Sequence, residues 1–175
     1  MTDRARLLEL ITGIAVVRGR VVLSSGQEAD YYIDLRRITL HHEAAPLVGP
    51  VMLDTVADWS FDAVGGLTLG ADPVAAAMLH ASAGTLDAFV VRKEGKAHGL
   101  QRRVEGPDVA GRRVLALEDT STTGASVLSA VDALQEAGAE VVGVAVIVDR
   151  GTARDAVQAR GLDYRAAYTA EELGI

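Results

Sequence analysis

An acidic doublet followed by hydroxyl residues offers the clearest chemistry in the sequence. The segment LALEDTSTTGAS (115–126) passes from apolar residues to two carboxylates, Glu118 and Asp119. Hydroxyl groups and the free N–H groups of a helix start can surround a phosphate, and carboxylates accept hydrogen bonds from the vicinal hydroxyls of a ribose. The segment therefore predicts a site for a ribose 5-phosphate. The residues that follow the doublet are Thr120, Ser121, Thr122, Thr123, Gly124, Ala125 and Ser126.

The same residues also allow a simpler explanation. A strand that ends in exposed acids, followed by a Ser or Thr helix cap, would look similar because such caps are favoured at any helix start. One cap residue is enough for that purpose, whereas this segment has four hydroxyl residues in succession. No GK[ST] follows as in a Walker loop, and the chain has no GxGxxG for a dinucleotide. These observations favour the binding site.

Charge is distributed unevenly along the chain. The 175 residues carry a formal net charge of -7, which argues against a nucleic-acid partner because phosphate backbones are bound through basic surface. Residues 92–103 (RKEGKAHGLQRR) nevertheless hold five Arg or Lys residues against one Glu. A solvated basic loop would have this composition. Beside the segment at 115–126, however, we favour a loop that brings positive charge to a polyanion and hinges at its glycines.

The overall composition is that of one globular domain spanning residues 1–175. The absence of cysteine excludes disulfides, a thiolate nucleophile and thiolate metal sites. Neither a signal-peptide pattern nor a run of apolar residues long enough to cross a membrane occurs. We expect a cytoplasmic protein without a membrane partner.

Helix and strand patterns alternate along most of the chain. Apolar positions at steps of three and four residues predict helices at 3–17, at 43–59, from about residue 73, and at 124–137. Short apolar runs predict strands at 63–67, 87–92, 113–118 and 141–149. This alternation is typical of an α/β fold with a central parallel sheet flanked by helices. In such sheets ligands bind beyond the carboxyl ends of the strands, where the acidic doublet is expected.

Two regions do not follow the alternation. Within the first 40 residues, the extended segments 21–23 and 31–35 are separated by turn-forming residues. Residues 1–40 are therefore expected to form a small appendage outside the sheet. Residues 93–112 contain four glycines and a proline and have no period, which predicts a long functional or mobile loop.

Three segments together resemble a known family. EDTSTTGAS (118–126) resembles the phosphoribosyl pyrophosphate (PRPP) motif of the type I phosphoribosyltransferases. RKEGKAHG (92–99) resembles the catalytic loop of the orotate phosphoribosyltransferases, and LSSGQEADYYIDLR (23–36) resembles their N-terminal segment on the orotate side. The resemblance covers most of the chain and implies the type I phosphoribosyltransferase fold, with residues 1–40 as a small N-terminal hood. It also implies transfer of a 5-phosphoribosyl group from PRPP to orotate in de novo pyrimidine (UMP) biosynthesis, with orotidine 5-monophosphate and pyrophosphate as products.

The resemblance further implies roles for single residues and a cofactor. Departing pyrophosphate gains negative charge, which cations and Mg²⁺ stabilise. Mg²⁺ is the implied cofactor; no side chain is assigned as a direct ligand, and Asp119 is a candidate for contact through water. The implied catalytic residues are Arg92, Lys93, Lys96, His98 and Asp119. Those implied for PRPP are residues 118–126, named above from Glu118 to Ser126, together with the backbone of Gly70, Ala71 and Asp72. Those implied for orotate are Thr122, Arg150, Tyr32 and Ile33.

Several of these assignments have simpler alternatives. His98 is either a general acid or only a hydrogen-bond donor, and we favour the donor. On sequence grounds Arg150 is equally well a surface residue at a strand end. For Tyr32 and Ile33 the sequence alone favours core-facing residues of an ordinary strand. The glycine-rich segment 65–73 is also consistent with an ordinary turn between a strand and a helix.

The chain departs from the family at two positions and leaves two other functions to consider. Leu69 and Ser24 occupy positions where many relatives carry lysine, which puts those two contacts in doubt. The family implies a homodimer whose catalytic loop is shared across subunits. A purine phosphoribosyltransferase is disfavoured by RKEGKAHG and by the missing aromatic stack late in the chain. A non-catalytic, PRPP-sensing regulator that binds RNA or DNA is disfavoured because a basic face is absent.

Overall fold

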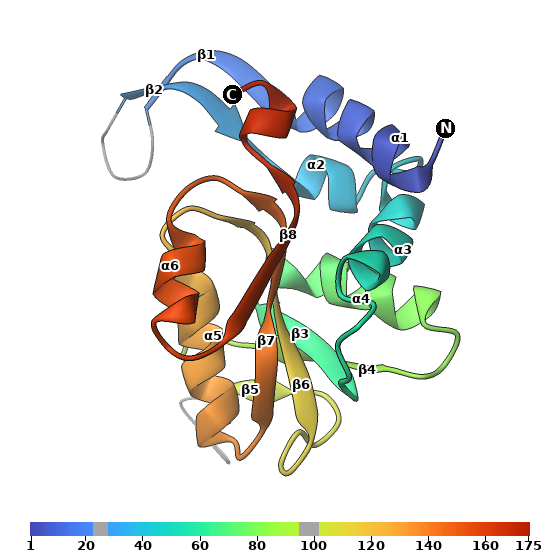
Figure 1. Cartoon of the computed structure of the whole chain (residues 1–175), viewed down its shortest axis with the longest axis vertical. Helices are drawn as coiled ribbons and strands as arrows, with labels where there is room; N and C mark the ends of the chain where they lie inside the picture. The colour runs from blue at the N-terminus through green and yellow to red at the C-terminus, as the bar shows by residue number, and fades with distance from the viewer. Residues whose placement is uncertain (23–27, 95–101) are drawn as a thin grey trace.

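A six-stranded sheet forms the centre of the molecule (Figure 1). The computed structural model describes residues 1–22, 28–94 and 102–175. Within these ranges the strand order is β5-β4-β3-β6-β7-β8, and all neighbours are parallel except β5, which runs antiparallel to β4. The carboxyl ends of the parallel strands therefore meet at one edge, and the expected parallel sheet is confirmed. The strands are β3 (Ala63–Leu67), β4 (Asp87–Val91), β5 (Val104–Glu105), β6 (Arg113–Ser121), β7 (Glu140–Asp149) and β8 (Asp163–Thr169).

Helices cover both faces of this sheet (Figure 1). One face packs against α3 (Ala45–Thr55) and α4 (Ala71–Ala81), and the other packs against α5 (Ala125–Glu136) and α6 (Ala153–Gln158). Successive residues of the central strand β6 alternate between the two cores. Leu115 belongs to the core under α3 and α4, whereas Ala116 belongs to the core under α5 and α6. Because both faces are buried, β7 is almost continuously apolar, and so are residues Val114–Leu117 of β6.

The N-terminal segment forms its own small sheet and also joins the main core. Strands β1 (Val16–Val22) and β2 (Glu28–Ile33) pair with each other and not with the central sheet. Helix α1 (Asp3–Leu10) and the short helix α2 (Arg36–Thr39) flank this hairpin. The side chains of Leu7 and Ile11 are fully buried in the core that α3 and α4 share with the sheet. Apolar packing thus anchors the N-terminal segment to the main core.

Several predicted boundaries at the ends of elements are wrong. The helix predicted at 43–59 spans only Ala45–Thr55 as α3, and the extended segment predicted at 31–35 is β2, which runs over Glu28–Ile33. The helix predicted at 3–17 ends as an α-helix at Leu10, continues as a π-helical turn over Ile11–Ala15, and gives way to strand β1. The β-branched residues that open β1 favour this extended backbone. Strand β6 runs three residues further than predicted, because Thr120 and Ser121 pair with Val148 and Asp149 of β7.

Other elements were not anticipated from the sequence. The region predicted as a loop at 93–112 contains the short edge strand β5. Helix α6 and strand β8 follow the last predicted strand, and a 3₁₀ turn at Glu171–Leu173 ends the chain. Strand β8 carries polar residues between apolar ones because it lies at the edge of the sheet.

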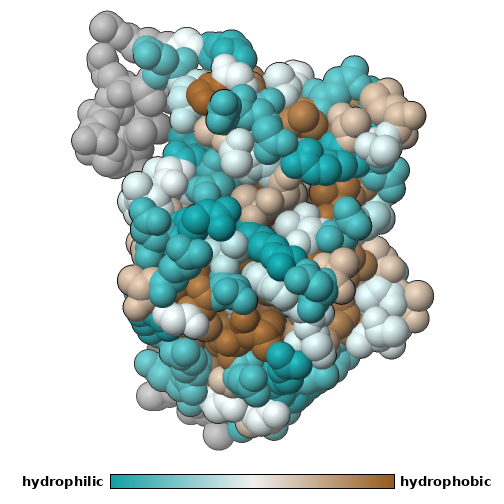
Figure 2. Space-filling view, in the orientation of Figure 1, coloured by the Kyte–Doolittle hydropathy of each residue, from teal (hydrophilic) through white to brown (hydrophobic). Residues whose placement is uncertain are grey.

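Hydrophilic residues make up most of the face viewed in Figure 1, with smaller hydrophobic areas between them (Figure 2). Most of the apolar residues lie in or against the two cores on either side of the sheet. In the described ranges, no helix has both the length and the apolar character needed to span a membrane.

Candidate active site

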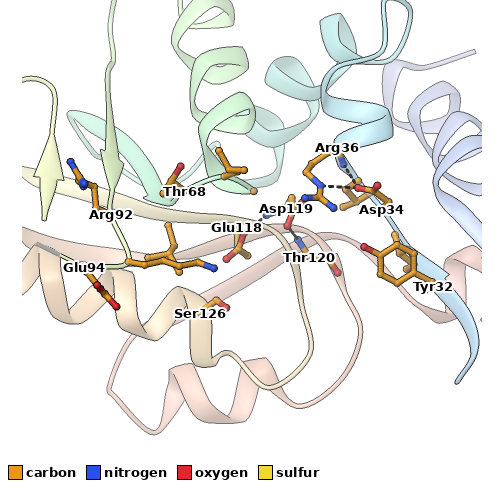
Figure 3. Close-up of a pocket in the computed structure, with 16 residues that line it drawn as sticks. Tyr32, Asp34, Arg36, Thr68, Arg92, Glu94, Glu118, Asp119, Thr120 and Ser126 are labelled. Carbon is orange, nitrogen blue, oxygen red and sulfur yellow. Dashed lines mark hydrogen bonds and ion pairs between the residues drawn. The ribbon is translucent and has the colours of Figure 1, made fainter. Parts of the chain in front are cut away.

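A cavity of about 930 Å³ opens at the carboxyl ends of the central strands (Figure 3). One wall comes from the end of β2 and the start of α2, and the opposite wall comes from the residues after β3 and β4. The floor comes from the end of β6 and the first turn of α5. The lining residues are Tyr32, Ile33, Asp34, Leu35, Arg36, Leu67, Thr68, Leu69, Gly70, Arg92, Lys93, Glu94, Glu118, Asp119, Thr120 and Ser126.

The acidic doublet lies in the middle of this cavity (Figure 3). Glu118 is only 7% exposed, and burial, followed by repulsion from Asp119, raises the pKa of Glu118 to about 8. Burial also raises the pKa of Asp119, although hydrogen bonds, mainly from the Thr120 N–H, and the charge of Arg36 oppose this shift. At neutral pH the pair therefore holds a proton for much of the time. A protonated carboxyl group both donates and accepts hydrogen bonds, which suits the hydroxyls of a sugar.

The loop between β3 and α4 packs directly on the acidic doublet. A Cβ atom on Gly70 would lie 2.6 Å from Glu118 Oε1 and 2.8 Å from Asp119 Oδ1, so any larger residue at this position would displace both carboxyl groups. The Thr68 hydroxyl donates a hydrogen bond of 2.6 Å to Asp72 Oδ2 and holds the loop to the first turn of α4. Helix α4 thus starts beside the two carboxyl groups, and the free N–H groups of its first turn lie close to them.

Of the other residues considered in this loop, only Leu69 lines the cavity. Leu69 lines the cavity and is 69% exposed, so this position contributes an apolar side chain to the site. Ala71 is fully buried, and neither Ala71 nor Asp72 belongs to the cavity lining. The contacts predicted for their backbone N–H groups stay predictions.

The hydroxyl residues after the doublet divide between strand and turn. Thr120 and Ser126 line the cavity. The Thr120 hydroxyl is buried without a hydrogen-bond partner in the part of the chain that the structure describes, so its hydrogen-bonding capacity is unused. Gly124 is the N-cap of α5 and has φ of +84°, a left-handed conformation that favours glycine.

The other members of the motif do not line the cavity. Ser121 is 7% exposed and lies at the end of β6, whereas Thr122 and Thr123 are exposed in the turn, and Ala125 begins α5. This turn is tied to the neighbouring loop, because the Thr152 N–H donates a hydrogen bond of 2.7 Å to the Thr122 carbonyl. Direct contacts of these residues with a ligand remain predictions.

Cations lie on two sides of the acidic doublet. Arg92 and Lys93 line the cavity where β4 ends. Arg36 lies on the opposite wall, and its Nε donates a hydrogen bond of 3.0 Å to Asp34 Oδ1 (Figure 3). Both substrates expected from the sequence are anions, and these side chains supply the positive charge needed to attract them. Predicted residues Lys96 and His98, like Ser24, lie outside the described residues.

The predicted orotate residues are only partly brought together. Tyr32 and Ile33 line the cavity, and Tyr32 lies at the end away from Arg92 (Figure 3). The Arg150 guanidinium lies over the ring of Tyr31, 5.3 Å from its centroid, and Arg150 is not part of the lining. Its buried Nε has no hydrogen-bond partner among the residues described. The role of Arg150 therefore stays a prediction.

Four polar lining residues were missed in the sequence: Asp34, Arg36, Thr68 and Glu94. A signal existed for the first two, because Asp34 and Arg36 directly follow the extended segment that contains Tyr32. Opposite charges at the end of a strand beside a predicted binding residue indicate the same site. Thr68 gave no signal of its own, since a threonine in a glycine-rich turn is common.

The cavity fits a magnesium ion that arrives with a polyanionic substrate. Among the described residues no cluster of three or more His, Cys, Asp or Glu side chains could enclose a metal. Mg²⁺ usually keeps several waters and is held by one or two carboxylates together with substrate phosphates. Glu118 and Asp119 on the floor of the open cavity supply such a donor set.

The parallel sheet, the acidic doublet at a strand end and the helix start behind it define a type I phosphoribosyltransferase. In agreement, a family model described as the phosphoribosyl transferase domain matches residues 41–166. The chain is 68% identical over 98% of its length to the orotate phosphoribosyltransferase of Streptomyces avermitilis, of which the match covers 97%. The chain belongs to the orotate phosphoribosyltransferase family.

Solved structures agree with this family. A crystal structure of the Mycobacterium tuberculosis orotate phosphoribosyltransferase with Fe(III) dicitrate superposes with a TM-score of 0.92 at 58% identity, covering 99% of this chain and 100% of that chain. A second crystal structure of that enzyme, in complex with PRPP, superposes with a TM-score of 0.87 at 53% identity, with the same coverage. The fold expected from the sequence is therefore confirmed over nearly the whole chain.

Proposed function

We propose that this chain transfers the 5-phosphoribosyl group of PRPP to orotate, forming orotidine 5-monophosphate and pyrophosphate, as a step of de novo pyrimidine (UMP) biosynthesis. One observation carries the proposal. The acidic doublet lies on a single cavity between the cations that follow β4 and the aromatic side chain of Tyr32 (Figure 3). A ribose on the doublet would therefore have room for a diphosphate on one side and a pyrimidine on the other.

The ribose and its 5-phosphate would occupy the floor of the cavity. Glu118 and Asp119 would exchange hydrogen bonds with the two ribose hydroxyls. The 5-phosphate would accept hydrogen bonds from the hydroxyls of Thr120 and Ser126 and from the free N–H groups at the start of α5. The left-handed backbone at Gly124 supports this arrangement because it turns the chain from β6 directly into that helix start.

The diphosphate would lie between the loop after β3 and the end of β4. As a ring nitrogen of orotate forms its bond to C1 of the ribose, the bond from C1 to the pyrophosphate oxygen breaks and negative charge grows on the leaving group. We propose that this charge is stabilised by the side chains of Arg92 and Lys93, together with those of Lys96 and His98. Backbone N–H groups of residues 70–72 would contact the same group. Mg²⁺, when bound with PRPP, would add positive charge to the diphosphate.

The pyrimidine would lie beside Tyr32 and Ile33, with Thr122 and Arg150 as further contacts. A guanidinium matches a planar carboxylate through two parallel hydrogen bonds. The unpartnered Nε of Arg150 supports this role, since a buried donor favours a ligand that accepts its hydrogen bond. The base would then be held between the hood and the loop that follows β7.

Two further parts of the proposal concern the assembly and the cell compartment. We infer a homodimer in which the segment around Lys96 contributes to the partner's cavity, as the family resemblance implies. A cytoplasmic location is supported by the complete absence of cysteine. Residues 1–175 would act as one phosphoribosyltransferase domain, with residues 1–40 as its hood.

Loss of orotate absorbance on mixing the protein with orotate, PRPP and Mg²⁺ tests the proposal. We expect the absorbance to fall with orotate and no product to form from hypoxanthine or adenine. The variant Asp119→Asn, which alters a proposed site residue, should slow the reaction at least about tenfold, or ~1.4 kcal/mol. Turnover of a purine base but not of orotate would refute the assignment.

A further inference from the structure

The side chain of Arg103 joins the two ends of the segment that runs from β4 to β5. The Arg92 N–H donates a hydrogen bond of 2.7 Å to the Arg103 carbonyl. In return, Arg103 Nε donates a hydrogen bond of 3.2 Å to the Arg92 carbonyl. The backbone bond extends the pairing of β4 with β5 by one residue on each strand, and the side-chain bond reinforces the same pair of residues. The backbone of Arg92 is thus held through both its N–H and its carbonyl group.

The same side chain also reaches the helix that begins at the cavity. Arg103 Nη2 donates a hydrogen bond of 3.1 Å to the Ser129 hydroxyl of α5. Ser129 lies three residues after Ser126, so both serines lie on the same side of the helix. Ser126 lines the cavity. Arg103 therefore links the end of β4 to the helix turn that follows the proposed phosphate site.

Apolar packing makes this junction rigid. Val91 at the end of β4 is fully buried in the core under α5, and Val104 packs against the same core. Val127 of α5 is buried there as well. The Arg92 guanidinium lies 3.6 Å from Glu105 Oε1 at the outer side of the junction. Arg92 and Lys93, which line the cavity next to the junction together with Glu94, thus emerge from a fixed base.

We propose that Arg103 is a positioning residue for phosphoribosyl transfer, which holds the corner formed by Arg92 and Lys93 at a set distance from the start of α5. This inference rests on the proposed function, because it assumes that the corner meets the diphosphate while α5 meets the 5-phosphate. Both groups belong to one substrate molecule, so the spacing between their binding sites matters. Misplacement of a catalytic group by about 1 Å lowers a rate by as much as 100-fold.

An arginine is suited to this position for a geometric reason. Its planar guanidinium offers donors in fixed directions and can serve the Arg92 carbonyl and the Ser129 hydroxyl at once, whereas lysine is a compact point charge on a flexible stem. Arg102, the preceding residue, is exposed. It provides a control of equal charge at the adjacent position.

Steady-state kinetics of Arg103→Ala and Arg102→Ala, with orotate and PRPP varied in turn, test the inference. We expect Arg103→Ala to lower kcat/KM for PRPP at least about tenfold and Arg102→Ala to change it by less than about twofold. Ser129→Ala should give a smaller loss in the same direction, and Arg103→Lys should recover part of the activity. Equal effects at positions 102 and 103, or a fall in Tm of Arg103→Ala with kcat/KM preserved, would overturn the inference.

A double-mutant cycle with Lys93→Ala separates positioning from a general loss of structure. If Arg103 acts through the corner, Arg103→Ala should have little further effect once Lys93 is absent. Full additivity of the two losses would count against the inference. Failure of the wild-type protein to convert orotate would instead refute the proposed function, so the two failures are distinguishable.

Discussion

At the scale of single residues, the acidic doublet combines burial with access to a ligand. Glu118 is nearly enclosed by protein, yet its carboxyl group forms part of the cavity floor beside Gly70. Burial of a charge is unfavourable unless the charge is paired, and the neighbouring Asp119 makes ionisation of Glu118 harder still. The ionised form of the Glu118 carboxyl group is therefore disfavoured in the folded protein. A strongly shifted pKa of this kind is typical of functional sites.

The raised pKa of Glu118 predicts a specific pH dependence of stability in the absence of ligand and Mg²⁺. Because the folded-state pKa of about 8 exceeds the ordinary value of 4.5, folding is favoured by this group below pH 4.5 and progressively less as pH rises towards 8. Glu118→Gln removes the titration. We expect the variant to gain stability relative to the wild type between pH 5 and about 8, by ~1.4 kcal/mol or more. Urea denaturation across this range measures the difference.

The control for this experiment is Glu136→Gln, at an exposed position on the last turn of α5. Its stability relative to the wild type should change little over the same pH range. A constant difference between Glu118→Gln and the wild type from pH 5 to pH 8 would show that the Glu118 carboxyl group is not held protonated in the folded protein.

At the scale of elements, the turn from β6 into α5 is fixed by one left-handed residue. Gly124 has φ of +84°, and a Cβ atom there would lie 3.4 Å from the Cα of Ala153. The chain leaves the strand at Ser121 and begins the helix at Ala125, so only three residues connect them. The direction of the helix start, and with it the proposed phosphate site, depends on this conformation.

Gly124→Ala should therefore weaken both the fold and PRPP binding. Placing a non-glycine residue in the left-handed region costs about 1–2 kcal/mol. Gly161→Ala is the matched control, because Gly161 also has a left-handed φ, of +72°, and lies in open space before β8. We expect similar losses in urea stability for the two variants but a raised KM for PRPP only for Gly124→Ala. Equal KM values for the two variants would separate this turn from the phosphate.

Helices and strands could be predicted from the sequence where the spacing of apolar residues and the length of the segment indicate the same element. The strands around 63–67 and 141–149 are continuous apolar runs bounded by polar or turn residues, and both lie where they were expected. The end of β6 could not be predicted, because the residues after Glu118 are polar. They belong to the strand only because they pair with β7. Such pairing depends on tertiary contacts that local propensity does not contain.

The candidate site was predictable only in part, for a similar reason. The acidic doublet, Thr120 and Ser126 follow from residue type and spacing within one segment. Arg36 was missed because its place in the cavity depends on how the N-terminal segment packs onto the sheet. That packing brings together residues more than 80 positions apart in the sequence.

At the scale of the whole molecule, the cavity needs both the hood and the sheet. Tyr32 to Arg36 form one wall and the strand ends form the remainder. The buried side chains of α1 anchor the hood to the core shared with α3 and α4. In the proposed homodimer a third contribution would come from the partner chain. The site would then be complete only in the assembly.

Mixing two variants that each have lowered activity tests this shared site. Lys96→Ala removes a proposed cation of the shared segment, and Asp119→Asn removes a carboxylate of the cavity floor. Subunits exchanged at random would give mixed dimers in which one site of two is intact, so about a quarter of the wild-type activity should return. Sedimentation would check that dimers form. No recovery of activity from dimers that have exchanged subunits would mean that Lys96 serves the cavity of its own chain.

The binding of sugar phosphates measured by calorimetry tests the central claim, that the acidic doublet recognises the ribose hydroxyls of the substrate. Ribose 5-phosphate should bind the wild-type protein at least about tenfold, or ~1.4 kcal/mol, more tightly than 2-deoxyribose 5-phosphate. We predict that Asp119→Asn combined with Glu118→Gln abolishes this preference while both ligands still bind through the phosphate. A preference of unchanged size in the double variant would contradict it.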